Sequence, residues 1–248
     1  MKLRTWRLSI ATNRLYFRIL AYFLFLIIPT LIVGFIVYFA NISIFKRQLI
    51  EDVSSNLASS SKVIDNYLRT AEQTGMSFLM NDTVQQYLVP TYSQTLVERE
   101  RASSINKVLS SSRTIISPYI DDMFVYADKE WVYRSEGLDS FHSFFTSFYK
   151  FAEYDVSFWE MLLEDTFAFR VLPPTTIKKS FTGKAETVVP VVMAQYIRGN
   201  RSIVTITISA SSLMDILKEN AVNTSTKFLV LDQEGTPIIA DPALSDQA

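Results

Sequence analysis

The 248-residue sequence contains no cysteine and a single histidine, His142. The missing cysteines exclude disulfide bonds, thiol chemistry and thiolate zinc sites. One histidine cannot form a histidine-rich metal site, and any Ser-His-Asp arrangement would have to use His142. This residue lies between Phe141 and Ser143 in a segment crowded with aromatic side chains. We therefore expect His142 to be a packed or surface residue rather than a catalytic one.

Glycine is also scarce, with six residues, and the sequence has neither a G-x-x-x-x-G-K-[ST] nor a G-x-G-x-x-G pattern. Phosphate-binding loops of those two kinds are therefore excluded. A carboxylate pair, Asp121 and Asp122, begins a predicted strand. Adjacent strand side chains point to opposite faces, so this pattern predicts a solvated strand entrance and not a shared metal site. We predict no enzyme activity, no catalytic residue, no metal site and no cofactor.

The charges are unevenly distributed along the chain. Residues 1–47 carry seven basic and no acidic side chains, which leaves 17 basic against 25 acidic side chains, a net charge of −8, in residues 48–248. An acidic domain gains nothing from counterion release on a phosphate backbone. We therefore predict that this segment binds no nucleic acid.

A long apolar run occupies residues 19–40, where 22 residues follow one another without a charge. At about 1.5 Å per residue, a helix of this length spans roughly 33 Å, slightly more than the hydrocarbon core of a bilayer. The run has no polar face, unlike a buried core helix, and its Pro29 and Gly34 are tolerated in membrane helices. The pattern predicts one transmembrane helix over residues 19–40.

The flanking charges predict the orientation of this helix. Five basic side chains precede the run within residues 1–18, whereas only Lys46 and Arg47 follow it before Glu51. This asymmetry favours a cytoplasmic tail over residues 1–18 and an extracytoplasmic location after about residue 41, anchored in the cell membrane. A cleaved signal peptide is the alternative, but the exit around Ala40 lacks an A-x-A pattern and the run is long for a signal core.

An apolar stripe with helical spacing follows the predicted span, and no proline interrupts it before Pro90. Its members recur at intervals of three and four residues: Ile50, Val53, Leu57, Ser61, Ile64, Leu68, Ala71, Gly75 and Phe78. The spacing predicts one long helix that leaves the bilayer and continues into the following domain. Such a helix could connect a distal site with the membrane, and it also packs its own domain.

Helices and antiparallel strands alternate in the next part of the chain. The patterns predict a helix over residues 94–116, a hairpin with strands 122–127 and 131–134, and an aromatic helix over residues 141–148 laid against the sheet. Ser157 and Glu160 have the spacing of a capping box, which predicts a short helix from there to about Asp165. Two β-branched runs, 188–197 and 202–208, predict a hairpin with a glycine-containing connection.

A second, similar unit begins near the end of the sequence. After a helix for which Ser212 and Asp215 are the predicted cap, residues 227–240 read as strand, turn and strand, like the pair around residues 123–134. The expected division is a long helix plus a first module over residues 41–222 and the beginning of a second module over residues 223–248. Since such a module needs on the order of 100 residues to close a core, we expect the natural protein to be longer.

Several segments carry a resemblance to a known family: residues 120–126, 133–137 leading into 140–145, 188–192 with the strand ending at 208–209, and 228–232 with Gly235. With these segments, residues 19–240 resemble a double-Cache ectodomain, an extracellular relative of PAS domains. The likeness is greatest to the sensors of membrane-anchored AraC-type transcriptional regulators from Gram-positive bacteria. The fold class it implies is α+β, with a PAS-like antiparallel sheet, flanking helices and the start of a second PAS-like module.

The resemblance implies that a membrane-distal module senses a small ligand, or a binding protein carrying one, and passes the signal across the membrane. It further implies a homodimer and an output domain, absent here, that binds promoter DNA through helix-turn-helix motifs. Sensor histidine kinases carry ectodomains of the same build and are the nearest alternative, and chemoreceptors come third. A membrane-anchored scaffold without a ligand remains a structural alternative. A cavity with polar groups in the distal module would favour the sensor, and a solid core would favour the scaffold.

Aromatic side chains near the predicted sheet are the candidate ligand-binding residues. Tyrosine and tryptophan combine an apolar face with a hydrogen-bonding tip, which suits sugars, amino acids and other small metabolites. An arginine among them could hold a carboxylate in bidentate fashion. The alternative for each aromatic side chain is a place in the core. The predicted ligand-binding residues are Tyr126, Trp131, Tyr133, Arg134, Trp159 and Tyr196.

Overall fold

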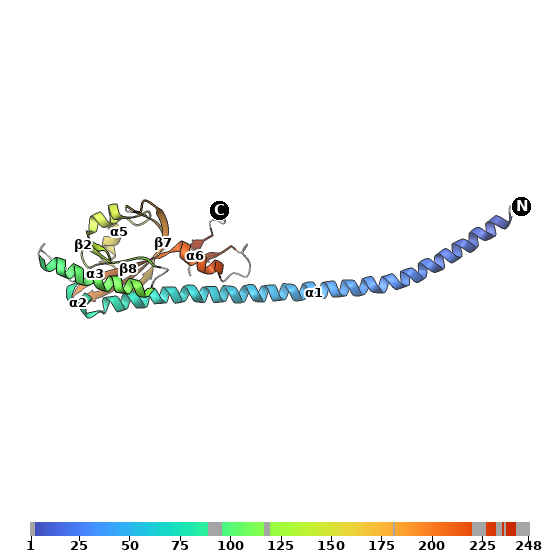
Figure 1. Ribbon diagram of the computed structural model, residues 1–248, viewed down its shortest axis with the longest axis horizontal. Helices are drawn as coiled ribbons and strands as arrows, with labels where there is room; N and C mark the ends of the chain where they lie inside the picture. Colours follow the sequence, from blue (N-terminus) through green and yellow to red (C-terminus); the bar gives the residue numbers. More distant parts are fainter. Residues whose placement is uncertain are drawn as a thin grey trace. The chain divides into compact units, whose positions relative to one another are not determined.

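The computed structural model describes residues 3–88, 96–116, 120–180, 182–219, 227–231, 235 and 237–241. The chain divides into two compact units, residues 1–55 and residues 56–248. The first unit consists of helix, and the second combines helices with an antiparallel sheet (Figure 1). The predicted α+β fold class, with a long apolar N-terminal helix and an antiparallel sheet with flanking helices, is confirmed.

Helix α1 runs from Leu3 to Leu79 without interruption, and it contains Pro29. Its apolar residues from Leu15 to Phe39 are exposed apart from the half-buried Ile27, and none of its most apolar stretch is buried. A core helix of a soluble protein would bury such a stretch, so this part of α1 is a candidate membrane span. The predicted long helix is therefore confirmed as a continuous element.

The apolar stripe on α1 has two different environments. Ile50, Val53 and Leu57 are 68%, 43% and 53% exposed, whereas Ala71 and Phe78 are 0% and 1% exposed. The later residues are buried because they pack against the sheet of the second unit. The first half of the stripe lacks such cover among the described residues.

Two further helices follow α1. Helix α2 (Asp82–Tyr87) begins at Asn81, whose side chain accepts hydrogen bonds from the N–H groups of Thr83 and Val84. Helix α3 (Leu96–Ile116) matches the predicted helix over residues 94–116, of which residues 94 and 95 lie outside the described part. Val84, Ile105 and Leu109 are fully buried, so both helices contribute to the core beside α1.

The sheet of the second unit has eight strands, and every pairing described is antiparallel. Its order is β3-β2-β1-β8-β7-β6-β4, with β5 also paired to β7. The bounds are β1 (Ile120–Tyr126), β2 (Trp131–Arg134), β3 (Gly137–Ser140), β4 (Tyr149–Phe151), β5 (Phe169–Val171), β6 (Thr175–Lys179), β7 (Ala185–Ile197) and β8 (Asn200–Ser209). The pairing of β1 with β8 joins the β1–β2 hairpin to the β7–β8 hairpin.

The long hairpin β7–β8 forms the centre of the sheet, as the β-branched runs predicted. Its turn residues Arg198 and Gly199 both have positive φ, 50° and 84°, which matches the right-handed twist of a two-residue hairpin. Pro190 has no N–H to donate, and it lies where the β7 edge changes partner from β6 to β5. Its carbonyl accepts the Leu172 N–H at 2.9 Å, so β7 stays hydrogen-bonded to the segment that leads from β5 to β6.

The segments that cover one face of the sheet differ in detail from the sequence-based expectations. The aromatic helix is present, but it consists of α4 (Phe141–Ser143) and a single π-helical turn, η1 (Phe144–Phe148). Helix α5 (Val156–Met161) is capped by Asp155, whose carboxylate accepts the Phe158 N–H at 2.9 Å. The predicted capping box at Ser157 is wrong, because the preceding aspartate occupies the cap position.

The last elements are helix α6 (Ala210–Glu219) and the hairpin of β9 (Leu229–Leu231) and β10 (Pro237–Ala240). The helix begins directly after β8, and the Ser209 hydroxyl accepts the Ser212 N–H at 3.4 Å. The predicted cap at Ser212 is therefore wrong by three residues. The predicted strand pair over residues 227–240 is confirmed, whereas the division into modules at residue 222 stays a prediction.

Two cores lie on opposite faces of the eight-stranded sheet. On one face, Met193, Val204 and Ile206 pack with α1, α2 and α3. On the other face, Phe124 and Tyr126 of β1 pack with α4, η1 and α5 in an aromatic cluster. Figure 1 shows α5 on one side of the sheet and α3 on the other. Alternate residues of the same strands supply the two cores, as the period of a β-strand requires.

Candidate functional site

Buried polar side chains gather at the beginning of strand β1. We call this group the acidic cluster and define it as Asp121, Asp122, Tyr149, Lys179 and Thr207. The Lys179 ammonium group forms an ion pair with Asp121, and both side chains are 10% exposed. The Tyr149 hydroxyl donates to the Asp122 carboxylate, which also accepts the Met123 N–H at 2.8 Å. The members come from β1, β4, β6 and β8, so the folded sheet is needed to assemble them.

The prediction of a solvated entrance at Asp121 and Asp122 is wrong. Asp122 is 5% exposed, and the pairing of β1 with β8 is irregular between Ile120 and Asp122. Such an irregularity breaks the alternation of side chains along a strand. Lys179 pairs with Asp121, and Tyr149 is hydrogen-bonded to Asp122. The Lys179 ammonium nitrogen lies 5.4 Å from the ring centre of Tyr149. Both carboxylates therefore reach one group of side chains.

Thr207 joins the two aspartates from strand β8. Its hydroxyl accepts the Asp122 N–H at 3.0 Å and lies within donating distance, 3.3 Å, of the Asp121 carboxylate. Thr207 is fully buried, and a threonine in this place satisfies polar groups that an apolar side chain would leave unpaired. No group of three histidine, aspartate or glutamate side chains suited to a metal ion is found within the described ranges.

Arg113 connects the acidic cluster to helix α3 and to the turn between β2 and β3. Its guanidinium group donates to the Asp121 carbonyl at 3.1 Å and to the Ser135 hydroxyl at 3.2 Å. It also lies 3.4 Å from the Glu136 carboxylate and 3.9 Å from that of Asp122. A cleft of about 360 Å³ lies beside it, with Ser135 and Glu136 in its wall. Arg113 therefore holds a helix, a strand and a turn together at one point.

Burial controls the electrostatics of the acidic cluster. Loss of hydration raises the pKa of Asp122 above its ordinary value, while the hydrogen bond from Tyr149 and the charge of Arg113 act in the opposite direction. Burial, together with the neighbouring Asp122, raises the pKa of Tyr149 far above that of a free tyrosine. Tyr149 is therefore a neutral hydrogen-bond donor at every physiological pH.

Three of the predicted ligand-binding residues lie on the face of the sheet that carries the aromatic cluster. Tyr126 is fully buried, and its hydroxyl donates to the Trp159 carbonyl at 3.0 Å. Trp159 is also fully buried, with its ring stacked on Phe145 at 4.8 Å between centres. The third, Arg134, forms a short ion pair with Asp139 at 2.7 Å, so its carboxylate partner here is a residue of the same chain.

The other three predicted residues lie elsewhere. Trp131 and Tyr133 pack against the core on the opposite face of the sheet, beside the helices. Tyr196 is 63% exposed, and the Arg201 guanidinium carbon lies 5.7 Å from its ring centre. The structure therefore does not bring the six residues together in one place, and their contact with a ligand stays a prediction.

Two buried polar atoms on the aromatic face have no hydrogen-bond partner among the described residues. They are the Trp159 indole nitrogen and the Thr205 hydroxyl oxygen, and both residues are fully buried. Thr205 is paired with Phe124 across β1 and β8, and the Phe124 ring lies 5.9 Å from that of Trp159. Buried polar groups are normally satisfied, so this unpaired donor and acceptor are unusual features of an otherwise apolar cluster.

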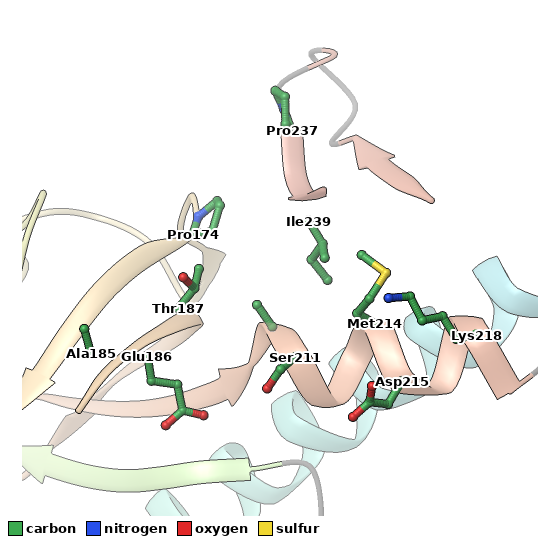
Figure 2. Close-up of a pocket in the computed structure, with 11 residues that line it drawn as sticks. Pro174, Ala185, Glu186, Thr187, Ser211, Met214, Asp215, Lys218, Pro237 and Ile239 are labelled. Carbon is green, nitrogen blue, oxygen red and sulfur yellow. The ribbon is translucent and has the colours of Figure 1, made fainter. Parts of the chain in front are cut away.

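A cleft lies between α6, the beginning of β7 and strand β10. It has a volume of about 550 Å³, and Glu186, Met214, Asp215 and Ile239 are in its wall. Figure 2 shows Met214 and Lys218 on the side of α6 that is nearer to Pro237 and Ile239. Lys218 is paired with Asp241 at 3.2 Å. This cleft contains residues of the first predicted module and of the hairpin that begins the second.

Sequence reasoning missed the groups that hold the acidic cluster together. Arg113, Tyr149, Lys179 and Thr207 lie at least eight positions, and up to 86 positions, from the aspartate that each contacts. Lys179 ends strand β6, in which buried and exposed residues alternate, but this alternation is visible only in the folded structure. The aspartates themselves were noticed, but their burial could not be read from neighbouring residues.

No family model matches the chain, and no curated protein matches it in sequence. Solved structures of the sensory domain of the Campylobacter jejuni chemoreceptor Tlp3 are similar in fold. The isoleucine complex is 15% identical, with 79% of this chain and 74% of that chain covered and a TM-score of 0.42. The 4-methylisoleucine complex is 16% identical, with 77% of this chain and 71% of that chain covered and a TM-score of 0.43. The L-valine complex is 15% identical, with 79% of this chain and 75% of that chain covered and a TM-score of 0.42. The amino-acid ligands in those complexes are ligands of Tlp3.

Proposed function

We propose that the chain is the extracytoplasmic input region of a membrane-anchored signalling protein, and that its second unit binds a small ligand. The observation that carries this proposal is the shared core of α1 and the sheet. Gly75 of α1 packs directly against Met193 and Val204, while the same helix contains the exposed apolar stretch that is the candidate span. A change in the sheet therefore acts on the element that enters the membrane.

The buried polar groups support ligand binding rather than a purely mechanical role. The aromatic face combines a packed ring cluster with an unpaired indole nitrogen and an unpaired hydroxyl oxygen, next to the charged acidic cluster. Apolar walls with few convergent polar groups are typical of small-molecule sites. A scaffold segment has no need of buried, unpaired polar atoms, because each one destabilises the fold. The single histidine, His142, is exposed, and we assign no catalysis to this region.

The proposed mechanism is a shift between two packing arrangements of the sheet and α1. A ligand can move this equilibrium only by the difference between its affinities for the two arrangements. Dimerisation fits the exposed half of the apolar stripe, since Ile50, Val53 and Leu57 form one face of α1 that a second copy would cover. The signal is then a change in the geometry of that dimer across the membrane.

For the output, we propose an AraC-type transcriptional regulator whose helix-turn-helix domain lies outside these 248 residues and binds promoter DNA. The sequence resemblance over residues 19–240 supports this choice. A sensor histidine kinase is the second candidate, because the same kind of input region suits it equally well. We place residues 1–18 in the cytoplasm and residues after about 41 outside the cell, in line with the basic flank of the span.

Thermal unfolding of the full chain in detergent micelles tests ligand binding. Three panels are added separately: neutral disaccharides, α-amino acids and dicarboxylates. A ligand that binds the folded state alone raises the melting temperature in proportion to the logarithm of its concentration. The proposal expects such a rise with members of one panel. A melting temperature that no member of any panel changes contradicts ligand sensing and favours a scaffold.

A further inference from the structure

Strand β8 carries a buried arginine close to the turn that joins it to β7. Arg201 is 9% exposed and lies opposite Tyr196 of β7. Its Nε donates to the Leu162 carbonyl at 3.1 Å, and its Nη2 donates to the Phe167 carbonyl at 2.7 Å. Both acceptors are neutral, and Arg201 forms no ion pair with any described carboxylate. Buried charges are normally paired with an opposite charge, so Arg201 is an exception.

One end of the Arg201 guanidinium group is left without an acceptor. A guanidinium group has five N–H donors, and the two carbonyls take one from Nε and one from Nη2. Both hydrogens of Nη1 and one of Nη2 have no acceptor among the described residues. Nη1 is not one of their buried polar atoms that lack a partner, so solvent reaches this end of the group. Two neighbouring nitrogens with free donors form the fork that binds both oxygens of a carboxylate.

Aromatic rings hold this guanidinium group in place. Its carbon atom lies 4.9 Å from the ring centre of Phe167 and 5.7 Å from that of Tyr196. The guanidinium carbon of Arg170 also lies 4.6 Å from the Phe167 ring centre. The Tyr196 ring is 63% exposed, so it offers apolar surface beside the free end of Arg201. The donors of Arg201 are therefore oriented before any partner arrives.

The charges around this site favour an anionic partner. Asp165 pairs with Arg170 at 2.8 Å. The hydrogen bond from Arg170 lowers the pKa of Asp165, and the charge of Arg201 lowers it further, so this carboxylate is ionised. Two arginines and one aspartate leave a charge of +1, whereas residues 48–248 carry 17 basic against 25 acidic side chains. An acidic partner is therefore repelled by the unit as a whole and attracted to this site.

The open position of the site favours a protein partner over a small acid. Tyr196 is exposed, and so is Arg198 in the two-residue turn between β7 and β8. A free carboxylate can make one charged contact here, and a single ion pair at an exposed surface contributes little. A peptide adds contact with the Tyr196 ring and with the charge of Arg198. Tyrosine and arginine are also enriched among the residues that dominate binding at protein interfaces.

We propose that the end of the β7–β8 hairpin is a docking surface for an acidic segment of a partner protein, one carboxylate of which binds Arg201 beside the Tyr196 ring. This surface is separate from the clefts beside Arg113 and α6, and it can act whether or not the second unit binds a small ligand. Arg201 also holds the carbonyls of Leu162 and Phe167, at the end of α5 and beyond it. Docking therefore acts directly on the segment that follows α5.

Fluorescence anisotropy of a fluorescein-labelled tetraglutamate peptide tests this proposal, with the full 248-residue chain in non-ionic detergent micelles. We expect saturable binding of this peptide and none of a labelled tetraglutamine peptide. Acetate at the same concentration of carboxylate groups should leave the acidic peptide bound. Displacement of the peptide by acetate would overturn a docking surface and would show a site for small acids.

Two variants that keep the net charge separate this site from general attraction to the basic residues 1–47. Arg201→Lys loses the planar fork, and Tyr196→Ala loses the exposed ring, so each should weaken peptide binding by about tenfold. Tyr196 is exposed, so its variant tests the site even where Arg201→Lys lowers the melting temperature. Arg18→Lys, a matched change outside the second unit, should leave the affinity unchanged. The proposal is overturned if the acidic peptide does not bind, or if Tyr196→Ala binds it as tightly as the natural chain does.

Discussion

Gly75 of helix α1 lies directly against Met193 of strand β7. A Cβ atom added at Gly75 would overlap the Met193 sulfur, lie 2.6 Å from the Met193 methyl carbon and lie 3.3 Å from Val204. Met193 and Val204 are both fully buried. The absence of a side chain at this one position lets the helix that contains the candidate span approach the centre of the sheet.

Larger residues at position 75 should therefore destabilise the second unit. Gly75→Leu forces a branched side chain into a filled core, with an expected loss of about 2 kcal/mol in the free energy of unfolding. Gly75→Ala should cost less, because the Met193 side chain can bend aside and alanine favours the helix by about 1 kcal/mol over glycine. Urea unfolding followed by far-UV circular dichroism measures both values.

Gly137→Ala is the control for this series, since a Cβ atom there meets nothing within 4 Å. It should leave the unfolding midpoint nearly unchanged. Met193→Ala combined with Gly75→Leu should cost less than the sum of the two single variants, because the residues are in contact. Additive costs would show that α1 and β7 are not in direct contact.

Asp122 gives the fold a defined dependence on pH. Because burial raises its pKa above 3.8, the unfolded chain loses this proton at a lower pH than the folded protein does. The contribution of Asp122 to stability therefore falls as pH rises from 3.8 through the raised pKa, and stays low above it. Asp122→Asn keeps a neutral, hydrogen-bonding group, so the variant should gain stability over the natural chain across this window.

The measurement is the difference in unfolding free energy between the two proteins at a series of pH values. Arg113, Asp121 and Tyr149 also face this carboxyl group and are left intact. Asp65→Asn changes an exposed aspartate on α1 and serves as the control, with no comparable trend in its difference. A difference for Asp122→Asn that shrinks as pH rises would contradict the desolvated state of this residue.

The exposed half of the apolar stripe on α1 predicts where two copies meet. The sequence has no cysteine, so single-cysteine variants report on one position at a time. In membranes under mild oxidation, Val53→Cys and Leu57→Cys should form dimers through disulfide bonds. Ser55→Cys, on the opposite side of the same helical turn, should react much more slowly. Equal rates at positions 53 and 55 would rule out this face as the contact.

The cap of α5 can be tested by comparing neighbours. Asp155→Ala removes the acceptor for the Phe158 N–H and should destabilise the fold, whereas Ser157→Ala should have a smaller effect. The hydrogen bond from Phe158 lowers the pKa of Asp155, so its stabilisation is present above pH 3.8 and is lost as pH falls toward the lowered pKa. Thermal unfolding at neutral and acidic pH checks both statements. A larger effect of Ser157→Ala would restore the capping-box interpretation.

Local patterns in the sequence were sufficient for the long elements of this fold. Helix α1 and the hairpin β7–β8 have apolar repeats that extend over many residues, so their periods are unambiguous. Strands β3 to β6 were missed because each has only three to five residues, too few to show a repeating pattern. The predicted hairpin ended at residue 134, whereas the sheet continues with β3, which begins at Gly137 and pairs with β2.

The site residues were harder to predict than the elements. The aromatic side chains were singled out by type, yet their faces depend on the register of strands that were not all recognised. Trp131 and Tyr133 occupy one face of β2 and Arg134 the other, as alternation requires. The burial of Asp122 depends on Tyr149 and Arg113, which approach it only in the folded sheet. Such distant contacts leave no periodic signal in a single sequence.

The proposed location of the second unit outside the cell is tested most directly by labelling two single-cysteine variants in intact cells. Lys184→Cys places a thiol at an exposed position of the second unit, and Ser9→Cys places one in the predicted cytoplasmic tail. A membrane-impermeant maleimide should label position 184 in intact cells and position 9 only after lysis. Labelling of position 9 in intact cells, with position 184 protected until lysis, would contradict an extracytoplasmic sensor.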